Sequence, residues 1–84
     1  TNMEHKIKAV KALSNYKLDV TFLEGISKTY DIKPLFKKIP EFLALKNDEQ
    51  MFTSVKVDIG GYGLVWNDKL DLSSDEIWKK GVVA

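Results

Sequence analysis

The segment Gly60-Gly61-Tyr62-Gly63-Leu64-Val65-Trp66-Asn67 organises the rest of the chain. Three of its first four residues are glycine, which readily adopts positive φ and lets another backbone approach closely. Such a cluster is typical of a turn or bulge between two strands. Apolar residues alternate with polar ones over 55–59 before it, and an apolar strand ending at Trp66 follows. We therefore expect a hairpin that closes the sheet, with these residues of its first strand facing inward: Val55, Val57 and Ile59.

Three strands are predicted ahead of this hairpin. Residues 6–12 alternate loosely, whereas residues 16–22 alternate cleanly with period two, which is typical of a strand with one buried face. A third strand is expected from Ile26 to Ile32, with short turns at Ser14-Asn15 and Glu24-Gly25 between the three. The residues expected to face inward are Tyr16, Leu18, Val20, Phe22, Ile26, Tyr30 and Ile32. Consecutive strands with short turns indicate an antiparallel meander.

The period changes to that of a helix between the meander and the hairpin. Pro34 suits the first turn of a helix, where its missing N–H does no harm. Pro40 ends that helix and opens a second short one at 41–45, and Asp48 is a fair N-cap for a last helical turn at 49–52. We expect these pieces to pack on the sheet through Leu35, Phe36, Ile39, Phe42, Leu45 and Phe52.

The end of the sequence predicts one more strand and one more helix. Leu70 and Leu72 indicate a short strand, and Ser73 and Glu76 have the spacing of a capping box for a helix that ends at Gly81. The predicted fold class is therefore α+β: an antiparallel three-strand meander, short helices, a C-terminal hairpin and a final short helix.

Length and composition restrict the class of protein. The 84 residues are enough for one domain. We expect residues 3–84 to form it, with Met3 as the natural first residue and the two residues before it left over from cloning. The sequence has no cysteine, which excludes a disulfide framework and a thiolate metal site and is compatible with the reducing cytoplasm where we expect the protein. No run approaches the roughly 18 apolar residues of a membrane span, so no membrane partner is expected.

Charge is distributed unevenly along the chain, although the net charge is only +1. Residues 1–46 hold nine lysines and five acidic residues (+4), and residues 47–84 hold four lysines and seven acidic residues (−3). Every basic residue is lysine. Arginine supplies the planar fork that reads guanine edges and grips phosphate with two bonds. Specific DNA reading is therefore not expected, while looser lysine–phosphate contacts stay open.

The order of the elements resembles one small bacterial family. The motifs that carry the likeness are Tyr30-Asp31-Ile32-Lys33-Pro34-Leu35, Gly63-Leu64-Val65-Trp66, Leu70-Asp71-Leu72 and Ser74-Asp75-Glu76-Ile77-Trp78. From about Ile7 to Trp78, the chain resembles the family catalogued as domain of unknown function number 2442. It departs from the family pattern at Asp68-Lys69, where members often have a glycine, and this leaves the turn type there open.

The resemblance implies an α+β fold and no established enzymatic activity. Family members are often short proteins encoded beside another small domain of unknown function, an arrangement commonly interpreted as toxin–antitoxin. Some members carry a helix-turn-helix segment after this domain, and the sequence up to Ala84 contains none. The family offers no catalytic residues to carry over to this chain.

The residues themselves show no catalytic pattern. Nucleophilic catalysis needs a nucleophile, a base and an orienting group, and the single histidine is His5, which we expect to be exposed and idle near a frayed terminus. The acidic residues of the last third lack the alternating spacing of an EF-hand loop. The glycine cluster precedes a strand rather than the helix of a phosphate-binding loop. We expect no catalytic residue, cofactor or metal, although a deep pocket holding both Asp58 and Asp71 would indicate a ligand binder.

Four residues are predicted to bind a partner: Tyr62, Trp66, Asp71 and Trp78. Tryptophan and tyrosine dominate interface hot spots, and Asp71 lies between two leucines and so points away from the side that they bury. The alternative for the two tryptophans is core packing. We expect a non-enzymatic protein-binding module, antitoxin-like or accessory to a small protein encoded nearby. The alternative is a nucleic-acid-associated regulatory domain that uses the lysine-rich first half, and an exposed sheet edge leaves a homodimer open.

Overall fold

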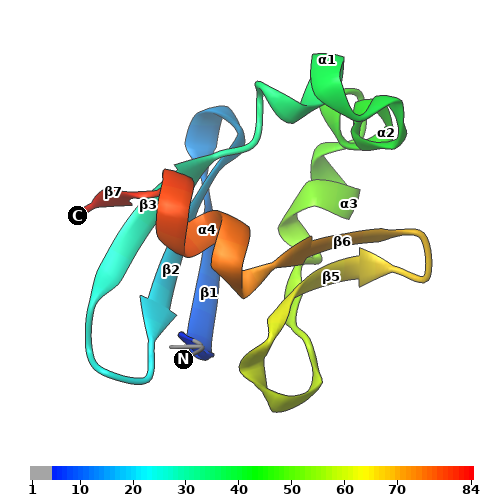
Figure 1. Cartoon of the computed structure of the whole chain (residues 1–84). Helices are drawn as coiled ribbons and strands as arrows, with labels where there is room; N and C mark the ends of the chain where they lie inside the picture. The colour runs from blue at the N-terminus through cyan, green and yellow to red at the C-terminus, as the bar shows by residue number, and fades with distance from the viewer. Residues whose placement is uncertain (1–4) are drawn as a thin grey trace.

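The structure is a computed structural model of the chain that describes residues 5–84. The expectation that Met3 is the natural first residue therefore lies outside the described residues. The fold is α+β, as predicted, and consists of two antiparallel sheets and several short helices (Figure 1).

The first sheet contains the predicted meander and one strand that was not predicted. Its order is β1-β2-β3-β7, with these bounds: β1 (Ile7–Leu13), β2 (Lys17–Phe22), β3 (Ser27–Asp31) and β7 (Val82–Val83). A register shift between Ile7 and Ala9 explains the loose alternation of β1. Gly81 ends the last helix as expected, because its N–H donates to the Ile77 carbonyl at 2.8 Å, and the chain then pairs with β3.

The predicted hairpin forms a second sheet, so the expectation that it closes the meander is wrong. The order is β4-β5-β6, with these bounds: β4 (Lys56–Val57), β5 (Gly63–Asn67) and β6 (Leu70–Ser73). β4 is short because the Asp58 carboxylate accepts a hydrogen bond from the Ile59 N–H at 2.8 Å and begins the 3₁₀ turn η3 (Ile59–Gly61). Ile59, predicted to face inward, is instead 92% exposed.

The helical elements are short, and the predicted N-caps at Asp48 and Ser73 form, but the Glu76 carboxylate bonds Tyr30 and does not complete the capping box with Ser73. The helical elements are η1 (Ser14–Tyr16), α1 (Leu35–Lys38), η2 (Pro40–Phe42), α2 (Leu43–Lys46), α3 (Glu49–Thr53) and α4 (Ser74–Lys80). The Asp48 carboxylate accepts from the Met51 N–H at 3.0 Å, and the Ser73 hydroxyl accepts from the Glu76 N–H at 3.1 Å. The Glu76 carboxylate accepts from the Tyr30 hydroxyl, and so α4 is tied to β3.

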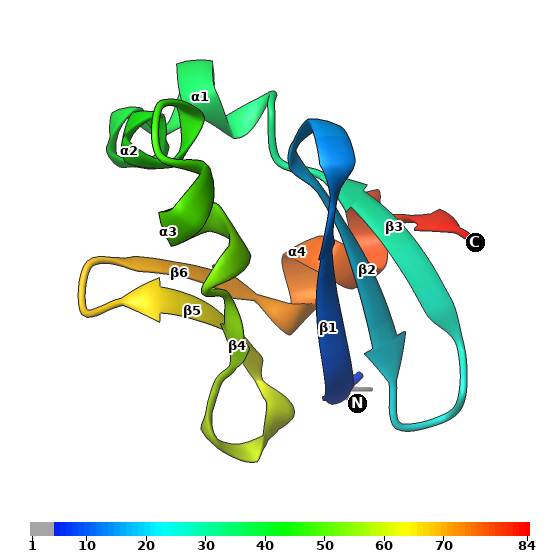
Figure 2. The same ribbon diagram turned by 180° about the vertical axis from the view of Figure 1, so that it is seen from behind.

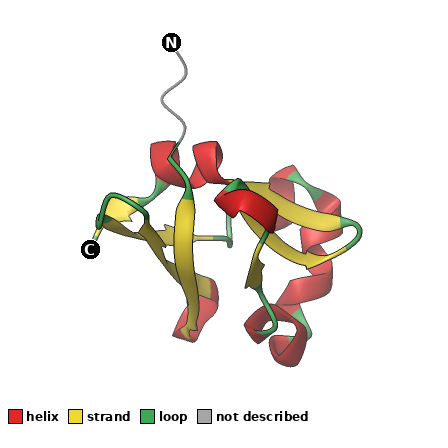
Figure 3. Ribbon diagram, turned by 90° about the horizontal axis from the view of Figure 1, so that it is seen from below, coloured by secondary structure: helices red, strands yellow, loops and turns green. Residues whose placement is uncertain are grey.

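One hydrophobic core joins the two sheets. α4 contacts β3 of the first sheet and both β5 and β6 of the second, and the view from behind shows it between them (Figure 2). The view from below shows the strands as two separate groups (Figure 3). The buried apolar residues are Ile7, Leu18, Val20, Phe22, Tyr30, Ile32, Leu35, Phe42, Leu45, Phe52, Leu64, Leu70, Leu72 and Ile77.

Two residues predicted to face this core are largely outside it. Ile26 is 38% exposed because it lies in the turn before β3, and Ile39 is 39% exposed. Ile39 has extended backbone with φ −130° between α1 and η2, so it leaves the helical face on which the spacing had placed it. Both residues lie at the ends of elements, where periodicity no longer sets the direction of a side chain.

Candidate protein-binding surface

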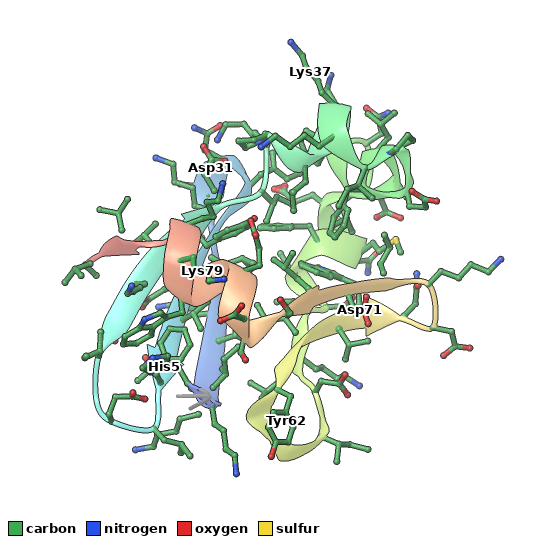
Figure 4. All side chains as sticks on the ribbon, in the orientation of Figure 1. His5, Asp31, Lys37, Tyr62, Asp71 and Lys79 are labelled. Atoms are coloured by element: carbon green, nitrogen blue, oxygen red, sulfur yellow. The ribbon has the colours of Figure 1, made fainter. Side chains whose placement is uncertain are left out.

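The structure does not gather the four predicted partner-binding residues at one place. Trp66 lies on β5 and Trp78 on α4, and both are half-buried against the core. Tyr62 follows the η3 turn, and Asp71 lies on β6, well apart from Tyr62 (Figure 4). Each residue therefore has to be considered in its own surroundings.

Trp66 links β5 to the helices. Its indole N–H donates to the Phe52 carbonyl at 3.1 Å. Its ring meets the ring of Phe42 edge to face, with centroids 5.7 Å apart. Buried indoles find such hydrogen-bond partners while their rings fill space. This arrangement supports the core-packing alternative for Trp66.

Trp78 is the centre of an aromatic cluster at the end of the first sheet. Its ring stacks on His5 with centroids 3.4 Å apart, meets Phe22 edge to face at 5.0 Å, and has the Lys28 ammonium 4.1 Å from its centroid. The expectation that His5 is exposed is wrong, because its side chain is only 18% exposed and its Nδ1 lies 2.6 Å from the Glu24 carboxylate. The hydrogen bond with His5 lowers the pKa of Glu24.

An ordered turn holds Tyr62 and Ile59 in solvent. Tyr62 is 49% exposed and Ile59 is 92% exposed. The Asp58 carbonyl accepts from the Gly61 N–H, the Gly63 carbonyl accepts from the Asp58 N–H, and each bond is 2.9 Å long. The Lys6 ammonium lies 5.2 Å from the centre of the Tyr62 ring. The turn is therefore fixed by its own backbone while its two largest apolar side chains stay accessible.

Two more exposed apolar residues lie at the same end of the molecule, in the turn between β2 and β3. Leu23 is 60% exposed, and its N–H donates to the Lys6 carbonyl at 2.9 Å. Lys6 therefore lies between this turn and η3, since its carbonyl bonds Leu23 and its ammonium lies near the Tyr62 ring. Both turns lie at the same end of the molecule (Figures 1 and 2). We call this the end surface and define it by its apolar residues Leu23, Ile26, Ile59 and Tyr62.

Sequence reasoning identified Tyr62 on this surface and missed Ile59 and Leu23. A signal for Ile59 was present, because Asp58 can cap a turn and Gly60-Gly61 can supply two positive φ angles directly after it. The observed φ angles are +77° at Gly60 and +79° at Gly61. No comparable signal marks Leu23, since it lies where the alternation of β2 ends.

Asp71 is exposed and points away from the buried face of β6, as predicted. It lies where two surface hollows meet, and both hollows are also lined by Ile39. The Asp58 carboxylate is used instead to cap η3 and lines neither hollow. A single deep pocket holding Asp58 and Asp71 is therefore not formed at either hollow.

Comparison with known protein families identifies the chain. The family described as Protein of unknown function (DUF2442) matches residues 7–82. The chain belongs to this family. Comparison with curated proteins and with solved structures gives no significant match. The resemblance inferred from the sequence is confirmed over nearly the whole chain. Because no curated protein or solved structure matches, the function of this DUF2442 domain has to be inferred from its own surface residues.

The described part of the DUF2442 domain has neither a candidate metal cluster nor a candidate membrane-spanning helix. Within residues 5–84, no three side chains of His, Cys, Asp or Glu come together in a way that suits a metal ion. None of the helices in the same range is both long enough and apolar enough to cross a bilayer.

Tyr30 gives the DUF2442 domain a testable alkaline response. Burial raises the pKa of Tyr30, and the hydrogen bond that its hydroxyl donates to Glu76 at 2.9 Å raises it further. A phenol whose pKa is higher in the folded state stabilises the fold below the ordinary tyrosine pKa of about 10 and loses this contribution as the pH rises above it. We expect Tyr30→Phe to make urea-unfolding stability fall less steeply above that pH. An unchanged slope would contradict this assignment.

Proposed function

We propose that this DUF2442 protein is a non-enzymatic protein-binding module of the bacterial cytoplasm, antitoxin-like or accessory to a small protein encoded beside it, and that the end surface makes the contact. The observation that carries the proposal is the 92% exposure of Ile59 in a turn fixed by Asp58 and the glycines. A turn of this kind holds an apolar side chain in place before a partner arrives, which lowers the entropy lost on binding.

The grouping of exposed apolar residues supports the same proposal. Single exposed apolar side chains are normal on any protein surface. Here the four members of the end surface come from two turns that lie on either side of residue 6. Exposed apolar residues that gather at one end of a molecule favour an interaction site more than an isolated residue does. Tyr62 adds an aromatic ring with a hydroxyl, the residue type that is enriched at interface hot spots.

The nucleic-acid alternative gains no support from the positions of the lysines. Lys28 lies over Trp78, and the Lys33 ammonium lies 3.0 Å from the Asp31 carboxylate. Partial burial raises the pKa of Asp31, but the hydrogen bonds from the backbone and side chain of Lys33 outweigh it and lower the pKa overall, so the Asp31 carboxylate stays charged beside Lys33. The lysines of the first half are spread over several elements, among them β1, β2, β3, α1 and α2.

The proposal predicts that two substitutions on the end surface weaken binding to the product of the neighbouring gene. Ile59→Asp and Tyr62→Ala are each expected to raise the Kd at least about tenfold, because hot-spot truncations cost more than a kcal/mol. Isothermal titration calorimetry on the purified pair measures this. Leu43→Ala is the matched control, since Leu43 is 45% exposed but lies on α2. Equal affinity for all four proteins, or no binding by the unsubstituted chain, would refute the proposal.

A further inference from the structure

A groove runs along the free edge of β6. β6 is an outer strand of the second sheet, whose order is β4-β5-β6. One hollow of about 510 Å³ is lined by Phe42, Leu70 and Asp71 among others. A second hollow of about 330 Å³ has Leu35, Leu72 and Asp71 in its lining. Asp71 lines both hollows, with Leu70 in the first and Leu72 in the second, so they follow one another along β6.

The hollows lie against the edge of the strand and not on one of its faces. Leu70 and Leu72 point into the core, whereas Asp71 points to the opposite side of the sheet. Residues whose side chains point to opposite sides of β6 nevertheless line this space, together with residues of α1 and η2. The open volume is therefore where the next strand of the sheet would lie.

The backbone of Asp71 is oriented for such a strand. The Tyr62 carbonyl accepts from the Ser74 N–H at 2.9 Å, whereas the Gly63 carbonyl accepts from Asp58 on the other side of β5. Gly63 and Ser73 are thus a non-hydrogen-bonded pair. The pair Val65–Asp71 lies two residues further along and has the same character, so the N–H and C=O of Asp71 point away from β5 and into the groove.

We infer that the β6 groove binds an extended segment of a partner protein as an additional strand. Alternate side chains of a strand point the same way and lie roughly 7 Å apart, so two apolar residues at positions i and i+2 would enter the two hollows. This groove is separate from the end surface, so a strand bound there would be a second contact beyond the one in the proposed function.

Charge at the second hollow indicates which segment fits. Lys38 and Lys80 line it, and neither forms an ion pair with a residue in the range 5–84. The same lining also holds two carboxylates: Glu76, which accepts from the Tyr30 hydroxyl, and Asp71, which points away from the side that the leucines bury. An acidic residue of the segment placed next to Lys38 or Lys80 and away from Asp71 would therefore be favoured by about the energy of an exposed ion pair.

A displayed library of random decapeptides, selected on the full chain, tests this inference. We expect enrichment of peptides with apolar residues at alternate positions and an Asp or Glu next to one of them. Asp71→Pro removes only an N–H that faces the groove, a substitution that edge strands accept. Asp71→Pro should raise the Kd of a synthesised enriched peptide about tenfold. Asp71→Asn keeps the N–H and should leave the Kd of the same peptide nearly unchanged. No enrichment, or equal binding by Asp71→Pro, would overturn the inference.

Two measurements keep this test independent of the folding of the proline variant. The same peptide N-methylated at its apolar positions should bind the unsubstituted chain at least about tenfold more weakly, since methylation removes its own strand donors. Amide shifts on peptide binding should concentrate in 70–73 and α1. Amide shifts concentrated at Ile59–Tyr62 would contradict peptide binding in the β6 groove and would be consistent with binding at the end surface. If the peptide binds at β6 but Ile59→Asp does not change the affinity for the neighbouring protein, the groove stands and the proposed end surface is refuted.

Discussion

Replacing Phe22 by alanine is expected to lower the free energy of unfolding by about 3–5 kcal/mol, the range for removing a buried phenylalanine ring. Phe22 is fully buried, and its ring lies 5.0 Å from that of Trp78 and 6.5 Å from that of His5, centroid to centroid. The substitution opens a cavity where β2 meets α4. A domain of 84 residues has a total stability of about 4–13 kcal/mol, so this variant would lie near the margin of folding.

Leu23→Ala is the control for this prediction, because it alters the next residue in the chain. Leu23 is 60% exposed, and truncating a side chain on the surface changes stability by no more than about 0.5 kcal/mol. Urea unfolding of the three proteins measures the difference. Comparable losses from Phe22→Ala and Leu23→Ala would mean that β2 does not bury the face observed here.

The burial of Phe22 was predictable because the rule that governs it is local. Successive side chains of a strand point to opposite faces, so the alternation over 16–22 identified the buried side of β2 without knowledge of its neighbours. The caps at Asp48 and Ser73 were predictable for the same reason, since each bond spans three residues. Rules of this range also predicted the helix start at Pro34 and the helix break at Pro40.

The arrangement of the strands was not predictable from such rules. Alternation shows which face of a strand is buried but not which strand it pairs with. The hairpin at 55–66 therefore read as part of the first sheet although it forms a second one. β7 was missed because a two-residue strand has no measurable period, and its pairing with β3 depends on where α4 ends.

The candidate site was predicted in part, with the same division between local and distant effects. The exposure of Tyr62 and the outward direction of Asp71 follow from a glycine-rich turn and from alternation in β6. The stacking of His5 on Trp78 joins residues from opposite ends of the described chain and leaves no sequence signal. The groove also has no sequence signal, because its walls come from α1 and β6, which lie far apart in the sequence.

Gly61→Ala is expected to destabilise the fold by about 3 kcal/mol, and so it tests whether the η3 turn is as fixed as the end surface requires. Gly61 has φ +79°, and a Cβ built on it would lie 2.6 Å from the Ile7 carbonyl oxygen and 3.1 Å from the Ile7 nitrogen. Both atoms belong to the backbone of β1, so relief requires the turn and the strand to separate. The substitution therefore combines the cost of positive φ with a collision that no side-chain rotation removes.

Gly25→Ala separates these two causes. Gly25 has φ +93°, and no atom beyond its two chain neighbours lies within 4 Å of a Cβ built there, so only the conformational cost of about 1–2 kcal/mol applies. In urea unfolding, the free energy of unfolding of Gly61→Ala should be lower than that of Gly25→Ala by at least about 1 kcal/mol, because only the Cβ at residue 61 collides with β1. Equal stabilities would show that η3 moves away from β1 at no cost. Ile59 and Tyr62 would then not be held in advance for a partner, and the entropic argument for the end surface would fail.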